Sequence, residues 1–129
     1  MIFVGTDIME IEKLSKSIKM NGMSLINRIF TKNEQEYCNL KRYPNIHYAG
    51  KFAGKEAIKK TMLSSNFFGS ISLKNIEIIN DESGKPCPII HYEKFDSFNF
   101  QLSISHADEY AIAFAIMTDD TSIIPRTIS

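Results

Sequence analysis

The chain has 129 residues, of which 43% are apolar and 23% are charged, a composition that fits one globular domain with a modest core. Its fifteen basic and fifteen acidic residues balance, so no field of the whole molecule favours nucleic acid as a partner. The acidic N-terminal stretch argues against a signal peptide, and the sequence has no apolar run of about 18 residues that would predict a membrane span.

The first half of the chain predicts one strand followed by helices. A β-branched apolar run from Ile2 to Ile8 predicts a buried strand. Apolar residues then recur at spacings of three and four, which is the period of a helix. Thr31 and Glu34 have the spacing of a capping box, which would start one helix, and Pro44 would start another. The helices are expected at about residues 9–22, 25–30, 31–41 and 44–62.

The second half changes to the alternating period of strands. Strands are expected at residues 70–80, 88–92, 100–105 and 110–117, with a turn at residues 81–86. The last of these strands is almost continuously apolar, which predicts a central strand or one at a buried interface. One strand, then helices, then strands predicts an α+β fold with a mostly antiparallel sheet packed with helices. Residues 1–117 are expected to form the single domain, and residues 118–129 a loosely held tail.

The two cysteines predict neither a disulfide nor a zinc site. Cys38 and Cys87 lie far apart in the sequence and form no CxxC pair. We therefore expect a reducing compartment and interpret the chain as a cytoplasmic protein.

Two carboxylates have both a structural and a functional interpretation. Asp7 ends the first predicted strand and would stabilise the start of the following helix through the helix dipole. Glu56 falls on the apolar stripe of the helix at 44–62, where a buried carboxylate needs a partner such as Lys60, four residues on. The functional alternative is that Asp7 and Glu56 meet around a divalent cation, together with substrate phosphates and waters. The spacing leaves both interpretations open.

A row of lysines flanks Glu56 on the same predicted helix. Lys51, Lys55 and Lys59 are spaced four residues apart. Such a row is most often a solvated helix face. Beside a metal ligand, however, the same cations would suit a polyphosphate.

Two shorter patterns also have plain structural interpretations. Gly84, Lys85 and Pro86 read as a turn between strands, although a glycine there lets a ligand approach the backbone. His106 follows a predicted strand, a position that is more often structural than catalytic. No catalytic triad spacing, Walker loop or GxGxxG motif accompanies them.

Five fragments in this order resemble the holo-[acyl-carrier-protein] synthases, the small bacterial type of 4′-phosphopantetheinyl transferase. The resemblance covers roughly residues 2–117. The fragments are GTDI from Gly5, RIFT from Arg28 with Glu34, KFAGKEA from Lys51 with Lys60, GKP from Gly84, and LSISH from Leu102 with Tyr110-Ala111. Each fragment is weak alone, but the set in this order and at this chain length is highly specific.

The resemblance implies a 4′-phosphopantetheinyl transferase fold and a reaction. The 4′-phosphopantetheine arm of coenzyme A would move to a serine of apo-acyl carrier protein, with adenosine 3′,5′-bisphosphate as the by-product. Asp7 and Glu56 would hold Mg²⁺, and Lys60 would face the coenzyme A pyrophosphate as the third catalytic residue. The coenzyme A site would also include Lys51, Lys55, Gly84, Lys85, Pro86 and His106.

The same resemblance implies partners and an assembly. Members of this size form homotrimers with each coenzyme A site at a subunit boundary. The first helix docks the carrier protein, for which Lys13, Lys16 and Lys19 are spaced to lie on one face here.

The chain departs from the family pattern at three positions. Lys51 stands where arginine is usual and lacks the bidentate fork, Gly54 stands where alanine is usual, and Ala107 where threonine is usual. Two alternatives to a transferase are a non-catalytic coenzyme A or nucleotide-binding module on the same fold, and a lysine-rich interaction domain. The joint presence of Asp7, Glu56 and Lys60 favours the transferase, because a pure binder does not require that metal arrangement.

Overall fold

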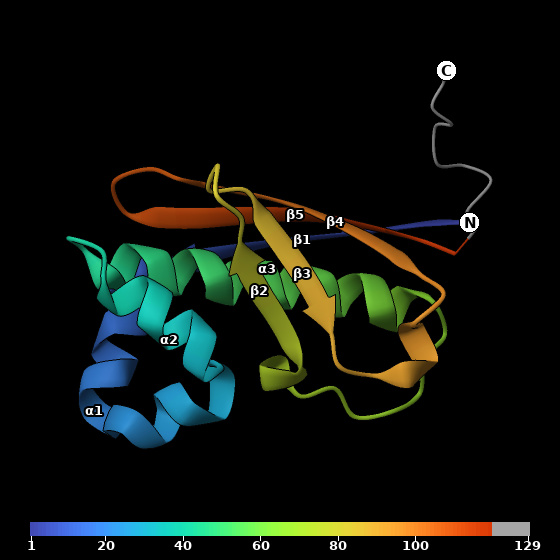
Figure 1. Ribbon diagram of the computed structural model, residues 1–129. Coiled ribbons are helices and arrows are strands. Elements are labelled where there is room, and N and C mark those ends of the chain that lie inside the picture. Colours follow the sequence, from blue (N-terminus) through green and yellow to red (C-terminus); the bar gives the residue numbers. More distant parts are fainter. Residues whose placement is uncertain (120–129) are drawn as a thin grey trace.

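The computed structural model describes residues 1–119, so the predicted tail lies outside the described residues from residue 120 onward. Three helices and five strands follow each other along the chain (Figure 1). They are β1 (Ile2–Glu10), α1 (Ile11–Ile29), α2 (Lys32–Asn39), α3 (Pro44–Ser64), β2 (Ile76–Asn80), β3 (Pro86–Ile90), β4 (Asn99–His106) and β5 (Tyr110–Thr118). Single 3₁₀ turns precede β2, at Leu73–Asn75, and β4, at Glu93–Phe95.

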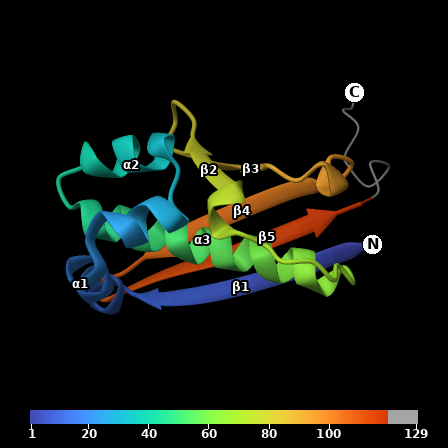
Figure 2. The ribbon, with the colours of Figure 1, turned by 90° about the horizontal axis from the view of Figure 1, so that it is seen from below.

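Helix α3 lies at the centre of the molecule, covered on more than one side. The order of the larger sheet is β1-β5-β4, and β2 and β3 form a separate pair. All these pairings are antiparallel. Helix α3 runs along the inner face of the larger sheet, with the β2–β3 pair, α1 and α2 packed around its other sides (Figures 1 and 2). This arrangement confirms the predicted α+β fold and the central place of the strand at 110–117.

The two faces of the larger sheet differ in burial. The inward residues of β5 are fully buried against α3, and three of them are alanines, which let the helix approach closely. The outward side chains Tyr110, Ile112 and Phe114 remain 42–49% exposed. The outward residues of β1 are similar: Ile2, Val4 and Ile8 are 55–60% exposed. An exposed apolar sheet face of this kind is typical of an interaction surface.

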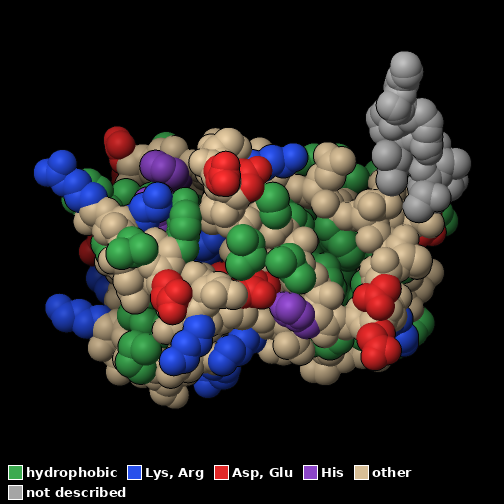
Figure 3. All heavy atoms as spheres, viewed as in Figure 1, with side chains coloured by type: hydrophobic (Ala, Val, Ile, Leu, Met, Phe, Trp, Pro, Cys, Tyr) green, Lys and Arg blue, Asp and Glu red, His purple; other side chains and the backbone are tan. Residues whose placement is uncertain are grey.

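Charged side chains are concentrated elsewhere. Lys and Arg side chains are most frequent on the left half of the face in Figure 3, over α1 and α2. The exposed side of α1 carries Lys13, Lys16 and Lys19, together with Met20 and Met23. No helix within residues 1–119 combines the length and the apolar character that crossing a membrane requires.

Glycines set how closely β1 and β4 approach α3. A Cβ atom on Gly5 would overlap the carbonyl oxygen of Ala57 and lie 3.0 Å from Cβ of Lys60. On the other side of α3, a Cβ on Gly54 would lie 3.1 Å from Cδ2 of Leu102 on β4 and 2.7 Å from Cδ1 of Ile78 on β2. The space that an alanine at position 54 would fill is therefore already occupied by core side chains.

Local signals predicted the helices better than the strands. The capping box of Thr31 and Glu34 is confirmed. The two helices expected at 9–22 and 25–30 form one element, α1, which contains a non-helical residue at Gly22. The prediction of a strand over 70–80 was wrong for its first half, because a 3₁₀ turn precedes β2. That turn brings the carbonyl oxygens of Leu73 and Ile76 to one buried ammonium, as described below.

Replacing Gly5 by alanine tests the contact between β1 and α3. We expect Gly5→Ala to lower the free energy of unfolding by about 2 kcal/mol or more, because the new methyl group meets backbone that cannot rotate away. Thermal unfolding monitored by circular dichroism measures this. Gly50→Ala is the matched control, since its Cβ would contact only a methyl group of Ile104 at 3.2 Å. Equal melting temperatures for the two variants would contradict the prediction.

Candidate active site

Asp7 and Lys60 form an ion pair between β1 and α3. The Lys60 ammonium donates to Oδ1 of Asp7 at 3.2 Å and to the carbonyl oxygen of Thr6 at 2.7 Å. The Lys60 side chain is 50% exposed, whereas that of Asp7 is 17% exposed. The cation therefore stays accessible to a ligand, while the carboxylate is held against the helix. An open hollow of about 510 Å³ lies beside Lys60, lined by Val4, Gly5, Thr6, Leu63 and Ser64.

Glu56 lies one turn before Lys60 on α3 and is half-buried. The ion pair that sequence considerations offered between Glu56 and Lys60 is absent, because Lys60 pairs with Asp7 instead. Among residues 1–119, neither an ion pair nor a side-chain hydrogen bond engages the Glu56 carboxylate. A half-buried carboxylate without a protein partner is free to accept an external ligand.

The antiparallel course of β1 and α3 brings Asp7 toward Glu56. Gly5 contacts α3 at Ala57 and Lys60. Asp7 lies two residues further along β1, about 7 Å toward the start of α3. The same rise corresponds to roughly four or five helical residues, so Asp7 lies level with the turn that contains Glu56.

Asp7 and Glu56 fit a magnesium site in which the protein supplies two carboxylates and the other ligands are substrate phosphates and waters. Within residues 1–119, no three side chains of the His, Cys, Asp or Glu types cluster so as to hold a metal ion. Mg²⁺ does not require such a cluster, because it is usually held by one or two carboxylates, substrate phosphates and waters. Asp7 and Glu56 would supply two carboxylates, and Lys60, which pairs with Asp7, borders an open hollow.

A second site lies on the other side of α3. It is a pocket of about 200 Å³ between the start of α3, the β2–β3 turn and the end of β4. Four of the residues implied by the family resemblance line it, namely Lys51, Gly84, Pro86 and His106. The other lining residues are Tyr37, Ile46, His47, Gly50, Asn80 and Ile104. Sequence reasoning missed these, because they come from four separate elements and carry no shared motif.

The charge state of His47 follows from its position in this pocket. Burial lowers the pKa of His47, and the neighbouring groups Lys41, His106 and Lys51 lower it further. The lowered pKa favours the neutral imidazole of His47, which accepts or donates hydrogen bonds without adding charge.

Lys85 lies in the turn at the rim of this pocket and is exposed. Gly84 has φ of 90°, a backbone conformation that favours glycine. Asp81 holds the turn, since its Oδ1 accepts from the backbone N–H groups of Ser83 and Lys85. The Ser83 hydroxyl also donates to Oδ1 of Asp81 at 2.7 Å, and this bond, followed by the backbone bonds, lowers the pKa of the Asp81 carboxyl group.

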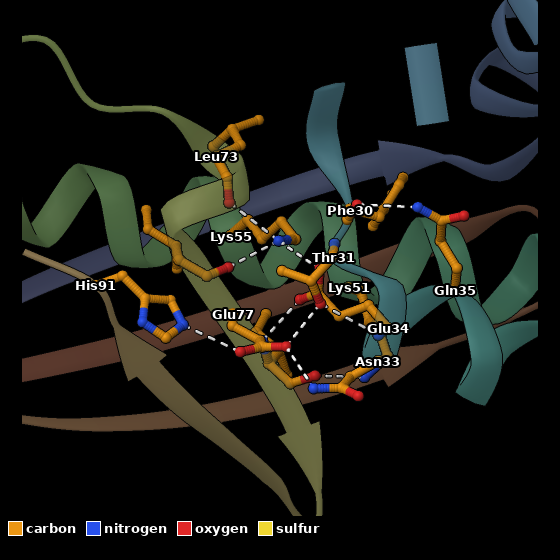
Figure 4. Close-up of polar contacts among 12 residues, drawn as sticks. Phe30, Thr31, Asn33, Glu34, Gln35, Lys51, Lys55, Leu73, Glu77 and His91 are labelled. Carbon is orange, nitrogen blue, oxygen red and sulfur yellow. Dashed lines mark hydrogen bonds and ion pairs between the residues drawn. The ribbon is translucent and has the colours of Figure 1, made fainter. Parts of the chain in front are cut away.

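Lys55 belongs to neither site, in contrast to the expectation for coenzyme A binding. Its side chain is fully buried, and its ammonium forms an ion pair with Glu34 at 2.7 Å (Figure 4). It also donates to the carbonyl oxygens of Leu73 and Ile76, at 3.0 and 2.7 Å. Burial lowers the pKa of Lys55, and the charge and hydrogen bond of Glu34 oppose this shift. An ammonium held in this way is unavailable to a phosphate.

The lysine row is mostly buried, and not exposed to solvent as such rows usually are. Lys51 and Lys55 both face β2, because residues four apart lie on one side of a helix. This side of α3 is covered by the β2–β3 pair and α2, so the row is not a solvated face. Only Lys59, at the end of the row, is partly exposed.

The two sites lie on nearly opposite sides of α3. Lys51 and Glu56 are five residues apart, a rotation of about 140° around the helix, and Lys51 and Lys60 are about 180° apart. One chain therefore does not bring Asp7, Glu56 and Lys60 together with Gly84, Pro86 and His106. The first set lies by β1 and the second by β4, which are the two edges of the larger sheet.

Comparison with known proteins identifies the family to which this fold belongs. A family model of the 4′-phosphopantetheinyl transferase superfamily matches residues 3–115. The chain belongs to this superfamily. A holo-[acyl-carrier-protein] synthase of Protochlamydia amoebophila is 44% identical over 117 residues, which cover 88% of this chain and 94% of the relative. One from Clostridium botulinum is 44% identical over 119 residues, with the same coverage.

Solved structures of holo-[acyl-carrier-protein] synthases have the same fold as this superfamily member. The Bacillus anthracis protein, in complex with coenzyme A (3′,5′-ADP), is 30% identical with a TM-score of 0.74, over 89% of this chain and 94% of that one. The Helicobacter pylori protein in complex with coenzyme A is 28% identical with a TM-score of 0.78, over 89% and 99% of the two chains.

The buried ion pair can be tested separately from either site. We expect Lys55→Met to lower the free energy of unfolding by about 3–5 kcal/mol, because it leaves the Glu34 charge buried without its partner. Chemical denaturation at neutral pH measures this. Adding Glu34→Gln to Lys55→Met should recover part of the loss, since the uncompensated charge is removed. Lys59→Met is the control, and a loss as large as that of Lys55→Met would contradict the prediction.

Proposed function

We propose that this protein transfers the 4′-phosphopantetheine moiety of coenzyme A to a serine of apo-acyl carrier protein, releasing adenosine 3′,5′-bisphosphate. Membership of the superfamily and identities of 44% to two holo-[acyl-carrier-protein] synthases support this activity. The observation that carries it is the Asp7–Lys60 ion pair between β1 and α3, with Glu56, unpaired among the described residues, one turn before Lys60 and an open hollow bordered by Lys60.

The chemistry requires stabilisation of charge on the pyrophosphate. Asp7 and Glu56 would hold Mg²⁺, which would neutralise charge developing on the phosphate oxygens. Lys60, which is half-exposed, would donate to the same oxygens. Asp7 holds the Lys60 ammonium at the mouth of the hollow, so the cation is positioned before the substrate arrives.

The second pocket would bind the nucleotide end of coenzyme A. At about 200 Å³ it is smaller than the roughly 300–1,000 Å³ of a site that encloses a whole ligand, so it would hold only part of this molecule. Gly84, Pro86 and His106 line it, and Lys85 at its rim would add positive charge for a phosphate group.

The separation of the two sites supports a homotrimer with coenzyme A at each subunit boundary. In a ring of three copies, the β1 edge of one subunit would meet the β4 edge of the next. The metal-binding carboxylates of one copy would then lie beside the nucleotide pocket of its neighbour. The exposed apolar face of β1 and β5 would be covered in the same assembly.

The carrier protein would dock on α1. Acyl carrier proteins are expected to be acidic, and the exposed lysines Lys13, Lys16 and Lys19 offer complementary charge. The exposed side chains of Met20 and Met23 would add apolar contact on the same helix.

The decisive experiment is an Mg²⁺-dependent transfer assay. The full chain is incubated with coenzyme A and apo-acyl carrier protein, and mass spectrometry of the carrier detects a phosphopantetheine adduct. No adduct at high concentration of the folded protein would contradict the transferase. Coenzyme A binding without transfer would favour the non-catalytic binding module on the same fold.

Glu56→Gln tests the metal site. We expect transfer to fall by about 100-fold or more, because the variant loses one of two carboxylates that stabilise charge on the pyrophosphate. The melting temperature should stay close to that of the wild type, since no ion pair of the described residues involves Glu56. Lys59→Gln, three residues on in the same helix, is the control for activity. A variant that unfolds instead would favour a structural role for Glu56.

Phe114→Lys tests the trimer. We expect light scattering to report a smaller species than for the wild type, because three buried charges would meet at the interface. Transfer activity should fall with it, since each site would need two copies. Ile89→Lys is the matched control, an apolar side chain of similar exposure on β3. A wild type that is monomeric and fully active would remove the proposed shared site.

A further inference from the structure

Lys51 lines the nucleotide pocket, but its ammonium is already bonded within the protein. The side chain is only 4% exposed. Its ammonium donates to the carbonyl oxygen of Ile78 at 2.8 Å and to Oδ1 of Asn80 at 2.6 Å. The ring of Tyr37 covers the same ammonium, with its centroid at 4.5 Å. Two of the three N–H donors are thus used, and the charge is shielded by an aromatic face.

Asn80, which accepts from Lys51, also forms a hydrogen bond to the turn at the rim of the pocket. Its amide nitrogen donates to the carbonyl oxygen of Gly84 at 3.0 Å. Asn80 closes β2, and it pairs with Pro86 across the turn. Lys51 on α3 is therefore linked through the Asn80 side chain to Gly84, which lines the pocket.

We infer that Lys51 is a positioning residue, which orients the Gly84–Pro86 turn through Asn80, and is not itself a ligand of a phosphate group. The inference rests on the proposed coenzyme A site. To bind a phosphate with more than its one remaining N–H, the ammonium would have to leave the buried carbonyl oxygen of Ile78 or the partly buried Oδ1 of Asn80, and that oxygen would lose its donor. Lys85, exposed in the same turn, is the cation placed to meet a phosphate.

Two ligands that differ only by one phosphate distinguish the two roles. Isothermal titration compares coenzyme A with dephospho-coenzyme A, which lacks the 3′-phosphate. We expect Lys51→Met to weaken the binding of both ligands by the same factor, about tenfold. Asn80→Ala should have the same effect, and the double variant should lose no more than either single variant. Lys32→Met, a surface lysine on α2, is the control for loss of one charge.

The opposite pattern would overturn the inference. A phosphate ligand at position 51 predicts that Lys51→Met weakens coenzyme A binding but leaves dephospho-coenzyme A binding unchanged. In that case Asn80→Ala, which frees the ammonium, would leave or improve the affinity for coenzyme A. Because Asn80 is partly exposed, this variant keeps the test valid even if Lys51→Met fails to fold.

A measurement without ligand separates this inference from the proposed function. Hydrogen exchange at the amides of Gly84 and Lys85 should be faster in Lys51→Met and in Asn80→Ala than in the wild type and in Lys32→Met. Unchanged exchange in both variants would overturn the positioning role, whether or not coenzyme A binds. A wild type that binds neither ligand, but has the predicted exchange pattern, would count against the proposed function alone.

Discussion

The ion pair between Lys55 and Glu34 joins three parts of the chain inside the protein. Glu34 belongs to α2, Lys55 to α3, and both bind the backbone of β2 or the turn before it. Glu34 also completes the capping box of its own helix. One carboxylate thus both caps α2 and pairs with Lys55 on α3. The β2–β3 pair therefore cannot move from α3 without breaking the hydrogen bond of Lys55 to Ile76 and that of Ile78 to Glu34, which would leave polar groups of the buried pair without partners. The position of the pocket beside Lys51 depends on this constraint.

Helix α3 divides the functional residues between two surfaces. One side carries Glu56 and Lys60 against β1, and the other carries Lys51 against β2. Both sets can be rigid because they share a helix that is packed on nearly all sides. The same rigidity prevents them from meeting within one chain. The proposed assembly of identical copies would solve this geometric problem, since a shared boundary can bring one side of α3 to the opposite side of its copy.

Sequence patterns predicted what depends on neighbours along the chain. The capping box at Thr31 and the apolar run of β5 are of this kind. The sequence also singled out Glu56, because a carboxylate on an apolar stripe demands an explanation. The burial of Lys55 could not be predicted in this way, since it depends on β2 and α2 covering one side of α3. The 3₁₀ turn at Leu73–Asn75 was missed for the same reason, as its carbonyl oxygens converge on a lysine 18 residues away.

The contact at Gly5 has a further consequence for which substitutions the core can tolerate. The distance between β1 and α3 is limited there by backbone against backbone, and not by the size of core side chains. Substitutions at large core positions such as Ile58 or Met62 can alter stability without altering that distance. Substitutions that accumulate in the core therefore need not change the spacing between Asp7 on β1 and Glu56 on α3. A lineage could repack its interior extensively while Asp7 and Glu56 kept the separation that the proposed metal site would require.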